Sequence, residues 1–174
     1  MIQSGKFVSF HMDIKKLSNA ALTFTANRLI EIFGIFVLIM GVLIFIALVS
    51  YSPEDPNFIF PENTIIKNVL GYQGSVASDF IFQSIGLIGY MLPITYIFTG
   101  INIFRKKEIL VFIENTFFVT IYILFGSLFF SKFYSENFTL YINGSGGFVG
   151  NYLSKNFFVN LLNRYEDFSY YLLP

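Results

Sequence analysis

Three long apolar stretches determine what this chain can fold into, because each is long enough to cross a lipid bilayer as a helix. A helix rises about 1.5 Å per residue, so about 20 residues match a hydrocarbon core of roughly 30 Å. The stretches occupy residues 29–49, 80–104 and 109–130. The middle one contains no charged residue between Asp79 and Arg105, a run that a soluble core helix rarely needs. The sequence therefore predicts a polytopic, all-α membrane protein.

The composition agrees with this class. Hydrophobic residues make up 55% of the 174 residues and charged residues 13%, whereas a soluble domain carries about a quarter charged residues. The net charge is +0, so overall electrostatics indicate neither a nucleic acid nor an acidic partner. The absence of cysteine excludes disulfides, thiolate metal sites and cysteine nucleophiles. Because His11 is the single histidine, we expect neither a metal site nor a catalytic residue.

The placement of charge predicts the orientation, because short cytoplasmic loops are enriched in Lys and Arg. Basic residues precede the first span and fill the turn between the second and the third: Lys6, Lys15, Lys16, Arg28, Arg105, Lys106 and Lys107. The connection over residues 50–79 instead has one basic residue, Lys67, against four acidic ones. We therefore predict an external loop at 50–79 and a cytoplasmic N-terminal segment over 1–28, either an interfacial helix or disordered.

The predicted transmembrane bundle extends over residues 29–162. Its spans are expected at about 29–50, 79–104 and 109–131, followed by an amphipathic external helix at about 147–162. We expect this last helix to lie along the membrane surface or to fold back on the external loop. The glycine-rich turn before it resembles a phosphate-binding loop but lacks the Lys and Ser or Thr that such a loop requires. Residues 163–174 lead toward a fourth span, so we expect a fragment of a longer protein.

Glycines predict where helices pack, because they let another backbone approach closely. The packing candidates are Gly34, Gly41, Gly86, Gly89, Gly100, Gly146 and Gly147. Pro93 lies inside the second predicted span and removes one backbone hydrogen bond, so it predicts a kink there. We favour a static kink over a moving hinge.

Acidic residues near the spans are weighed as functional candidates, because ionisable groups are costly in lipid. We expect Glu31 and Glu114 in the first turns of their helices at the cytoplasmic face and Asp79 at the external face. None of them is near the midplane, so a proton relay is not favoured, and Glu114 is the deepest candidate for transport. Glu54, Asp55 and Asp79 are candidates for contact with partners. A calcium site is not favoured, because adjacent carboxylates point different ways and no further ligand follows.

Several short motifs occur in a characteristic order. Residues 47–58 read Ala-Leu-Val-Ser-Tyr-Ser-Pro-Glu-Asp-Pro-Asn-Phe, and residues 71–74 read Gly-Tyr-Gln-Gly. Ser78 and Asp79 follow, and residues 82–93 read Phe-Gln-Ser-Ile-Gly-Leu-Ile-Gly-Tyr-Met-Leu-Pro. Residues 144–150 add Gly-Ser-Gly-Gly-Phe-Val-Gly. This order resembles the N-terminal four-helix membrane domain of the FtsK/SpoIIIE family of bacterial DNA translocases.

The resemblance implies a membrane anchor at the division septum of the bacterial inner membrane. It implies contact with the lipid bilayer and with other division-site membrane proteins, and a homo-oligomer formed through a cytoplasmic ATPase that moves chromosomal DNA. The chain itself contains no Walker motif or DNA-reading winged helix. We therefore expect ATP and magnesium to be bound only by the motor, and this segment to have no cofactor, no enzymatic activity and no direct contact with nucleic acid.

Two alternatives come from other classes. One is a small transporter or channel subunit that uses Glu114 and the kinked second helix, and the other is an independent membrane-assembly protein. An integral-membrane enzyme ranks behind both, because no nucleophile with a base and no carboxylate pair is visible.

Overall fold

The computed structural model describes residues 3–56, 65–134 and 142–158, and every regular element in this part is helical. The elements are, in order, α1 (Gln3–Val49), α2 (Gly71–Ile85), η1 (Gly86–Tyr90, a 3₁₀ helix), α3 (Met91–Lys106), α4 (Leu110–Phe133), α5 (Gly147–Tyr152) and η2 (Leu153–Phe158, a π-helical turn). Three stretches are long and apolar enough to cross a membrane: Lys16–Val49, Gly71–Lys106 and Leu110–Phe133. The predicted all-α membrane bundle is confirmed.

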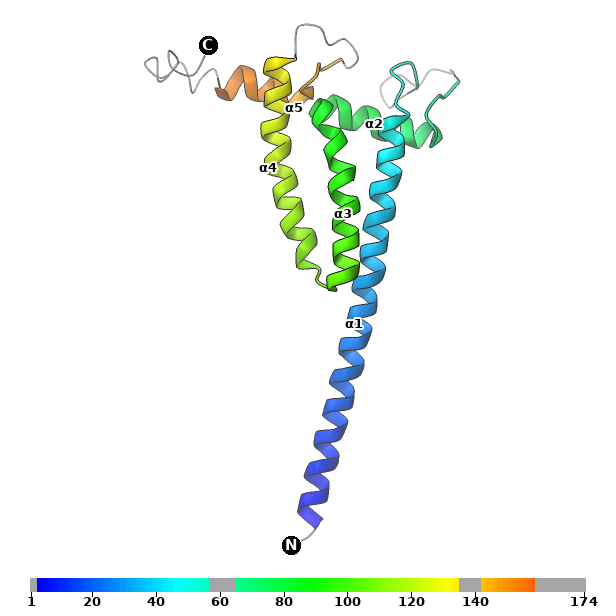
Figure 1. The fold of residues 1–174 in the computed structure, drawn as a ribbon, viewed down its shortest axis with the longest axis vertical. Helices are drawn as coiled ribbons and strands as arrows, with labels where there is room; N and C mark the ends of the chain where they lie inside the picture. Colours follow the sequence, from blue (N-terminus) through cyan, green and yellow to red (C-terminus); the bar gives the residue numbers. More distant parts are fainter. Residues whose placement is uncertain (1–2, 57–64, 135–141, 159–174) are drawn as a thin grey trace, which may run out of the picture.

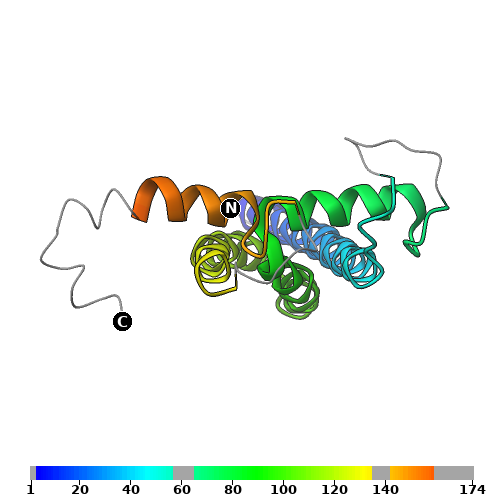
Figure 2. The same ribbon diagram turned by 90° about the horizontal axis from the view of Figure 1, so that it is seen from above.

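The helices are arranged in two directions. α1, α3 and α4 stand side by side, whereas α2 and α5 lie across one end of them (Figure 1). Seen from above, α2 and α5 follow each other along one flank of the three upright helices (Figure 2). We call α2, residues 142–146 and α5 together the cap, and the end of the bundle that they cover the capped end. The opposite end carries the turn from Arg105 to Lys107 and is called the basic end.

The second apolar stretch is not one straight helix. α2 ends at Ile85, Gly86 adopts a φ of +70°, and the chain turns there into η1 and α3. Only residues 86–106 run alongside α1, over about 34 Å at the rises of 3₁₀ and α helices. The predicted span at 79–104 therefore differs from the structure, which places residues 79–85 in the helix that lies across the end.

The kink expected at Pro93 is also displaced. Pro93 is the third residue of α3, within the first turn, where backbone N–H groups have no partner inside the helix. The change of direction lies upstream, at Gly86, whose positive φ is readily adopted by glycine. The proline thus follows the bend and does not form it.

The first helix is longer than predicted. α1 continues without a break from Gln3 through the first apolar stretch, and its N-terminal half projects beyond the basic end (Figure 1). No proline precedes Pro53, so nothing in the sequence stops this helix earlier. The N-terminal segment is therefore helical along the axis of the first span from Gln3 on. Glu31, which was expected in a first turn, lies well inside the helix.

Glycines bring α1 and α3 into backbone contact. A Cβ added to Gly100 would lie 2.5 Å from the backbone nitrogen of Leu38 and 2.6 Å from the carbonyl oxygen of Gly34. One added to Gly41 would lie 2.9 Å from the backbone nitrogen of Ile97. These distances leave no room for a side chain, so the three glycines determine how closely the two helices cross.

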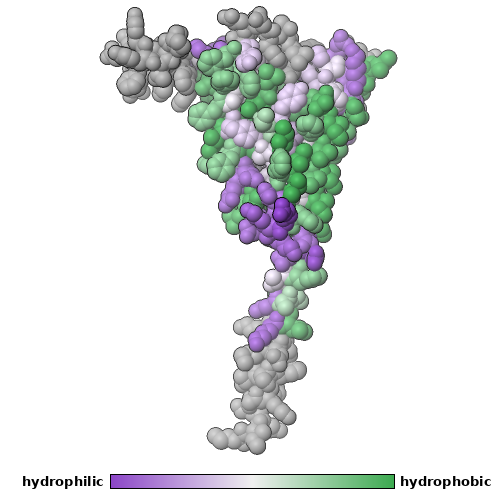
Figure 3. Space-filling model, in the orientation of Figure 1, coloured by the Kyte–Doolittle hydropathy of each residue, from purple (hydrophilic) through white to green (hydrophobic). Residues whose placement is uncertain are grey.

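The apolar core is densest at the capped end. Leu48 and Phe82 are fully buried, and the rings of Tyr51 and Tyr90 pack on Phe82 with centroid distances of 5.0 Å. Lower down, α3 and α4 are joined by polar side chains, such as Asn115, whose amide donates to Thr99 Oγ1 at 2.7 Å. Apolar residues cover the upright helices, and hydrophilic ones gather where α1 leaves the bundle (Figure 3).

Candidate functional site

A buried carboxylate closes the loop that follows α1. Asp55 is 5% exposed and accepts hydrogen bonds from the backbone N–H groups of Lys67 and Asn68, both at 2.8 Å. It therefore joins the two described ends of this loop, whose residues 57–64 lie outside the described part. Glu54 beside it is exposed and pairs with the Lys67 ammonium. The predicted interaction candidates of this loop thus divide into one buried and one exposed carboxylate.

Asn68, which is not among the predicted site residues, anchors the same loop to the bundle. Its amide donates to the carbonyl of Ala47 at 2.9 Å, near the end of α1, and its side-chain oxygen accepts from the N–H of Leu70 at 3.1 Å. Ser75 on α2 donates to the carbonyl of Pro56 at 2.8 Å. These bonds hold α2 against the end of α1, and an isolated Asn in a loop gives no sequence signal for them.

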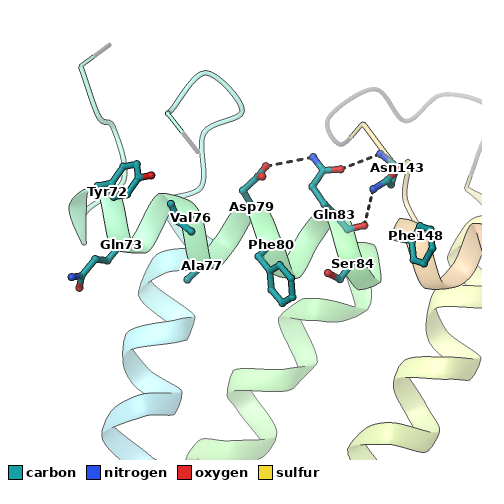
Figure 4. A pocket seen from close by; sticks show the side chains of 10 residues that line it. All are labelled: Tyr72, Gln73, Val76, Ala77, Asp79, Phe80, Gln83, Ser84, Asn143 and Phe148. Atoms are coloured by element: carbon teal, nitrogen blue, oxygen red, sulfur yellow. Dashed lines mark hydrogen bonds between the residues drawn. The ribbon is translucent and has the colours of Figure 1, made fainter. Parts of the chain in front are cut away.

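Asp79 belongs to a chain of polar contacts across the capped end. It accepts from the hydroxyl of Tyr51 at 3.2 Å and from the amide of Gln83 at 3.4 Å. Gln83 in turn accepts from the backbone N–H of Asn143, and its carbonyl accepts from the Asn143 amide, both at 3.1 Å (Figure 4). Burial and the neighbouring Asp79 charge raise the pKa of Tyr51 well above its usual range. Asp79 therefore connects the residues that follow α1 to α2, and Gln83 continues the chain of contacts to the glycine-rich turn.

The glycine-rich turn packs directly on the bend of the second apolar stretch. The N–H of Leu87 donates to the carbonyl of Ser145 at 2.8 Å. A Cβ on Gly86 would lie 2.0 Å from that carbonyl oxygen, and one on Gly147 would lie 2.5 Å from the backbone nitrogen of Gly86. Gly86 and Gly147, two predicted packing candidates, thus contact each other within one chain. Gly89 differs from them, because its nearest neighbour is the Ile81 side chain at 2.7 Å.

Small polar residues of α4 complete the cap. Cβ atoms on Gly146 and Gly150 would lie 2.3 and 2.2 Å from the carbonyl oxygen of Ser127, so α5 crosses α4 in backbone contact. Ser127 donates to the carbonyl of Ile85 at 2.9 Å, and Ser131 donates to Asn151 at 2.8 Å. These serines are not among the predicted packing residues, although small residues four apart in an apolar helix are a known packing signal.

A groove of about 640 Å³ runs along the outward side of α2 and reaches the start of α5 (Figure 4). It is lined by Tyr72, Gln73, Val76, Ala77, Asp79, Phe80, Gln83, Ser84, Asn143 and Phe148. Phe80 and Phe148 are among its most exposed members, at 71% and 61%. The polar groups of Asp79, Gln83 and Asn143 already bind one another, so the surface that the groove offers is mainly apolar.

The basic end holds a separate charged cluster. Glu31 is largely buried and bridges two cations, Arg28 on its own helix and the Lys107 ammonium at 3.0 Å. This contact joins α1 to the turn between α3 and α4. Glu114, the transport candidate, is exposed on α4 and not directed between the helices. Within the described residues, no three His, Cys, Asp or Glu side chains are grouped as metal ligands would be.

The fold defines a polytopic helical membrane domain whose one end is closed by helices that lie across it. The family described as the 4TM region of DNA translocase FtsK/SpoIIIE matches residues 26–166, which include most of the first span, the two other upright helices and the cap. The chain belongs to this family. The resemblance seen in the order of its motifs is thereby confirmed.

Curated relatives agree with this family. The chain is 29% identical over 126 residues to the DNA translocase FtsK of Rickettsia typhi and 30% identical over 126 residues to that of Rickettsia prowazekii. Each alignment covers 72% of this chain and 16% of the relative. The FtsK of Bradyrhizobium diazoefficiens is 31% identical over 70 residues. No solved structure matches the chain. The chain therefore corresponds to a small part of these relatives.

Proposed function

We propose that this chain is the membrane anchor of a DNA translocase and that it directs the protein to the division septum. The observation that supports this most is the family match, which covers the three upright helices and the cap together. The relatives carry the name DNA translocase, and the chain corresponds to 16% of the length of the first of them. In this proposal the motor, with its ATP and magnesium, belongs to the remainder of the protein.

The charges support an orientation for the anchor. The basic end carries Arg105, Lys106 and Lys107, and short cytoplasmic loops are enriched in such residues. We infer that this end faces the cytoplasm together with the N-terminal half of α1, and that the cap faces outward. A motor attached on the cytoplasmic side would then contact DNA, whereas this segment would not. Homo-oligomerisation through the motor and contact with other division proteins are further parts of the proposal.

The cap is the part that we propose for septal targeting, because it presents a folded surface on the external side. Its parts are joined by the bonds between Gln83 and Asn143, and Gly147 packs on Gly86, so its shape depends on these residues. A partner would therefore recognise the assembled cap, and a change that separates α5 from α2 would remove that surface.

The test is the position of the full chain in dividing bacteria, followed with a fluorescent protein at its N-terminus. We expect enrichment at the septum for the natural chain and for Gly144→Leu, because Gly144 has a positive φ but open space around it. Gly86→Leu should reach the membrane fraction but lose the enrichment. A uniform membrane signal for the natural chain would refute septal targeting, and equal enrichment of both variants would refute the role of the cap.

A further inference from the structure

We infer that one face of α2 and α5, the face turned away from the upright helices, is seated in the lipid headgroup region. The cap is then an interfacial element of the membrane. This inference rests on the chain crossing a bilayer and not on its role in a translocase. It assigns the groove along α2 to lipid, in place of a protein partner or a second copy of the chain. Depth, surface chemistry and hydrogen bonding each support it.

The depth of the cap follows from the lengths of the upright helices. Gly146 and Gly150 contact Ser127, which lies about 26 Å along α4 from Leu110 at the rise of an α-helix. Gly86 lies about 34 Å from the basic end of α3. The hydrocarbon core measures roughly 30 Å. If the cations of the basic end are placed at one boundary, the cap lies at the other boundary and not above it.

The two faces of α2 differ in the way expected for a helix at such a boundary. Gly74, Ser75, Ser78, Phe82 and Ile85 are buried on the side that faces the bundle. Tyr72 and Phe80 are exposed on the other side, at 46% and 71%. On α5, Phe148 and Tyr152 are exposed and their rings stack with centroids 6.1 Å apart. Aromatic residues gather at the membrane–water boundary, where an apolar ring also meets polar groups.

The hydrogen bonding of the groove favours lipid over a polar occupant. Asp79 is the one charged residue of α2, and its carboxylate accepts from Tyr51 and Gln83. Gln83 also binds Asn143 through its side chain and its backbone. An extended peptide would need a continuous row of donors and acceptors along its path, and Gln73 and Ser84 are the other polar side chains of the lining besides Tyr72. Acyl chains need only the apolar surface that Val76, Ala77 and Phe80 supply.

The chain contains no tryptophan, so a single introduced one reports on its own surroundings. The test uses Phe80→Trp in the full chain, reconstituted in phosphatidylcholine vesicles with brominated acyl chains, which quench nearby tryptophan. Phe118→Trp, exposed near the middle of α4, is the lipid-facing control, and Leu17→Trp, exposed on the projecting part of α1, is the water-facing control. Circular dichroism verifies that each variant keeps its helical content.

We expect lipid bromines to quench Phe80→Trp about half as strongly as Phe118→Trp, because a ring at headgroup level has water on one side. Bromines near the headgroup should be the most effective, and Phe148→Trp should behave in the same way. Quenching by aqueous iodide alone, as for Leu17→Trp, would overturn the inference. Protection from both quenchers would also overturn it, since it would show that a second copy of the chain covers the groove.

Discussion

Gly86 joins the two directions of the fold, and replacing it with alanine is the sharpest test of that arrangement. An alanine Cβ would lie 2.0 Å from the carbonyl oxygen of Ser145, so the glycine-rich turn would have to move by more than an ångström. Gly86 combines a φ of +70° with a ψ of −148°, a backbone region that is essentially restricted to glycine and costs another residue about 1–3 kcal/mol, and overpacking adds about 1–3 kcal/mol. Movement of the turn also weakens the bond from Leu87 N–H, worth about 1 kcal/mol. We expect Gly86→Ala to lower the free energy of unfolding by about 4 kcal/mol.

Two other glycines separate the backbone cost from the packing cost. Gly71 and Gly144 also have positive φ values, +67° and +74°, but nothing lies within 4 Å of a Cβ added to either. Gly71→Ala and Gly144→Ala should therefore cost only about 1–2 kcal/mol each. The assay is reversible unfolding by SDS in mixed micelles, followed by circular dichroism. If the loss in the free energy of unfolding for Gly86→Ala is within about 0.5 kcal/mol of the loss for both controls, the packing of the glycine-rich turn on the bend at Gly86 is refuted.

The carboxylates and the tyrosine of the capped end give three further predictions. Asp55→Ala should lower the free energy of unfolding by about 3 kcal/mol in the same assay, because the buried N–H of Asn68 and the partly buried N–H of Lys67 lose their acceptor, and Asp55→Asn should cost less. Burial and Asp79 raise the pKa of Tyr51. The stabilisation of the fold by the neutral Tyr51 is therefore present below its pKa in the unfolded chain and is lost only as pH rises through its higher pKa in the folded chain. Ultraviolet titration should show a tyrosine that ionises above the usual range and is missing in Tyr51→Phe, and Asp79→Asn should lower the pKa of Tyr51. Lys67 lowers the pKa of Glu54. The stabilisation of the fold by this ion pair is therefore present above the pKa of Glu54 in the unfolded chain and disappears as pH falls through its pKa in the folded chain. In Lys67→Gln, carboxyl NMR should show that the pKa of Glu54 rises to its ordinary value. A Glu54 pKa that stays as low as in the natural chain would contradict the ion pair.

Hydropathy was enough to predict the class of the fold but not the path of the second apolar stretch. Hydropathy measures how apolar a segment is and contains no information on backbone dihedral angles. The stretch from Phe80 to Phe104 therefore looked like one span, although its first residues belong to α2. At the turn, Gly86 and Leu87 contact Ser145, which is far away in the sequence. Pro93 was the stronger local signal, and it was misleading because a proline is tolerated in the first turn of a helix.

The glycine pattern indicated close packing, but the sequence did not indicate the partners. Gly34 and Gly100 contact each other across α1 and α3, and Gly86 and Gly147 contact each other across the cap. Which pairs meet depends on the crossing of helices far apart in the chain. For the same reason the role of Asp55 was open in the sequence, since a carboxylate in a loop can face solvent or bind backbone N–H groups. Only the folded loop shows that it is buried.

The central claim is that the three upright helices cross the membrane with the basic end in the cytoplasm and the cap outside. The chain has no cysteine, so single cysteines can report accessibility at each end. Ile65→Cys lies at the capped end, where Ile65 is 91% exposed, and Lys106→Cys lies exposed at the basic end. In intact spheroplasts a membrane-impermeant maleimide should label Ile65→Cys at once and Lys106→Cys only after the membrane is opened. Labelling of Lys106→Cys in intact spheroplasts would contradict the account.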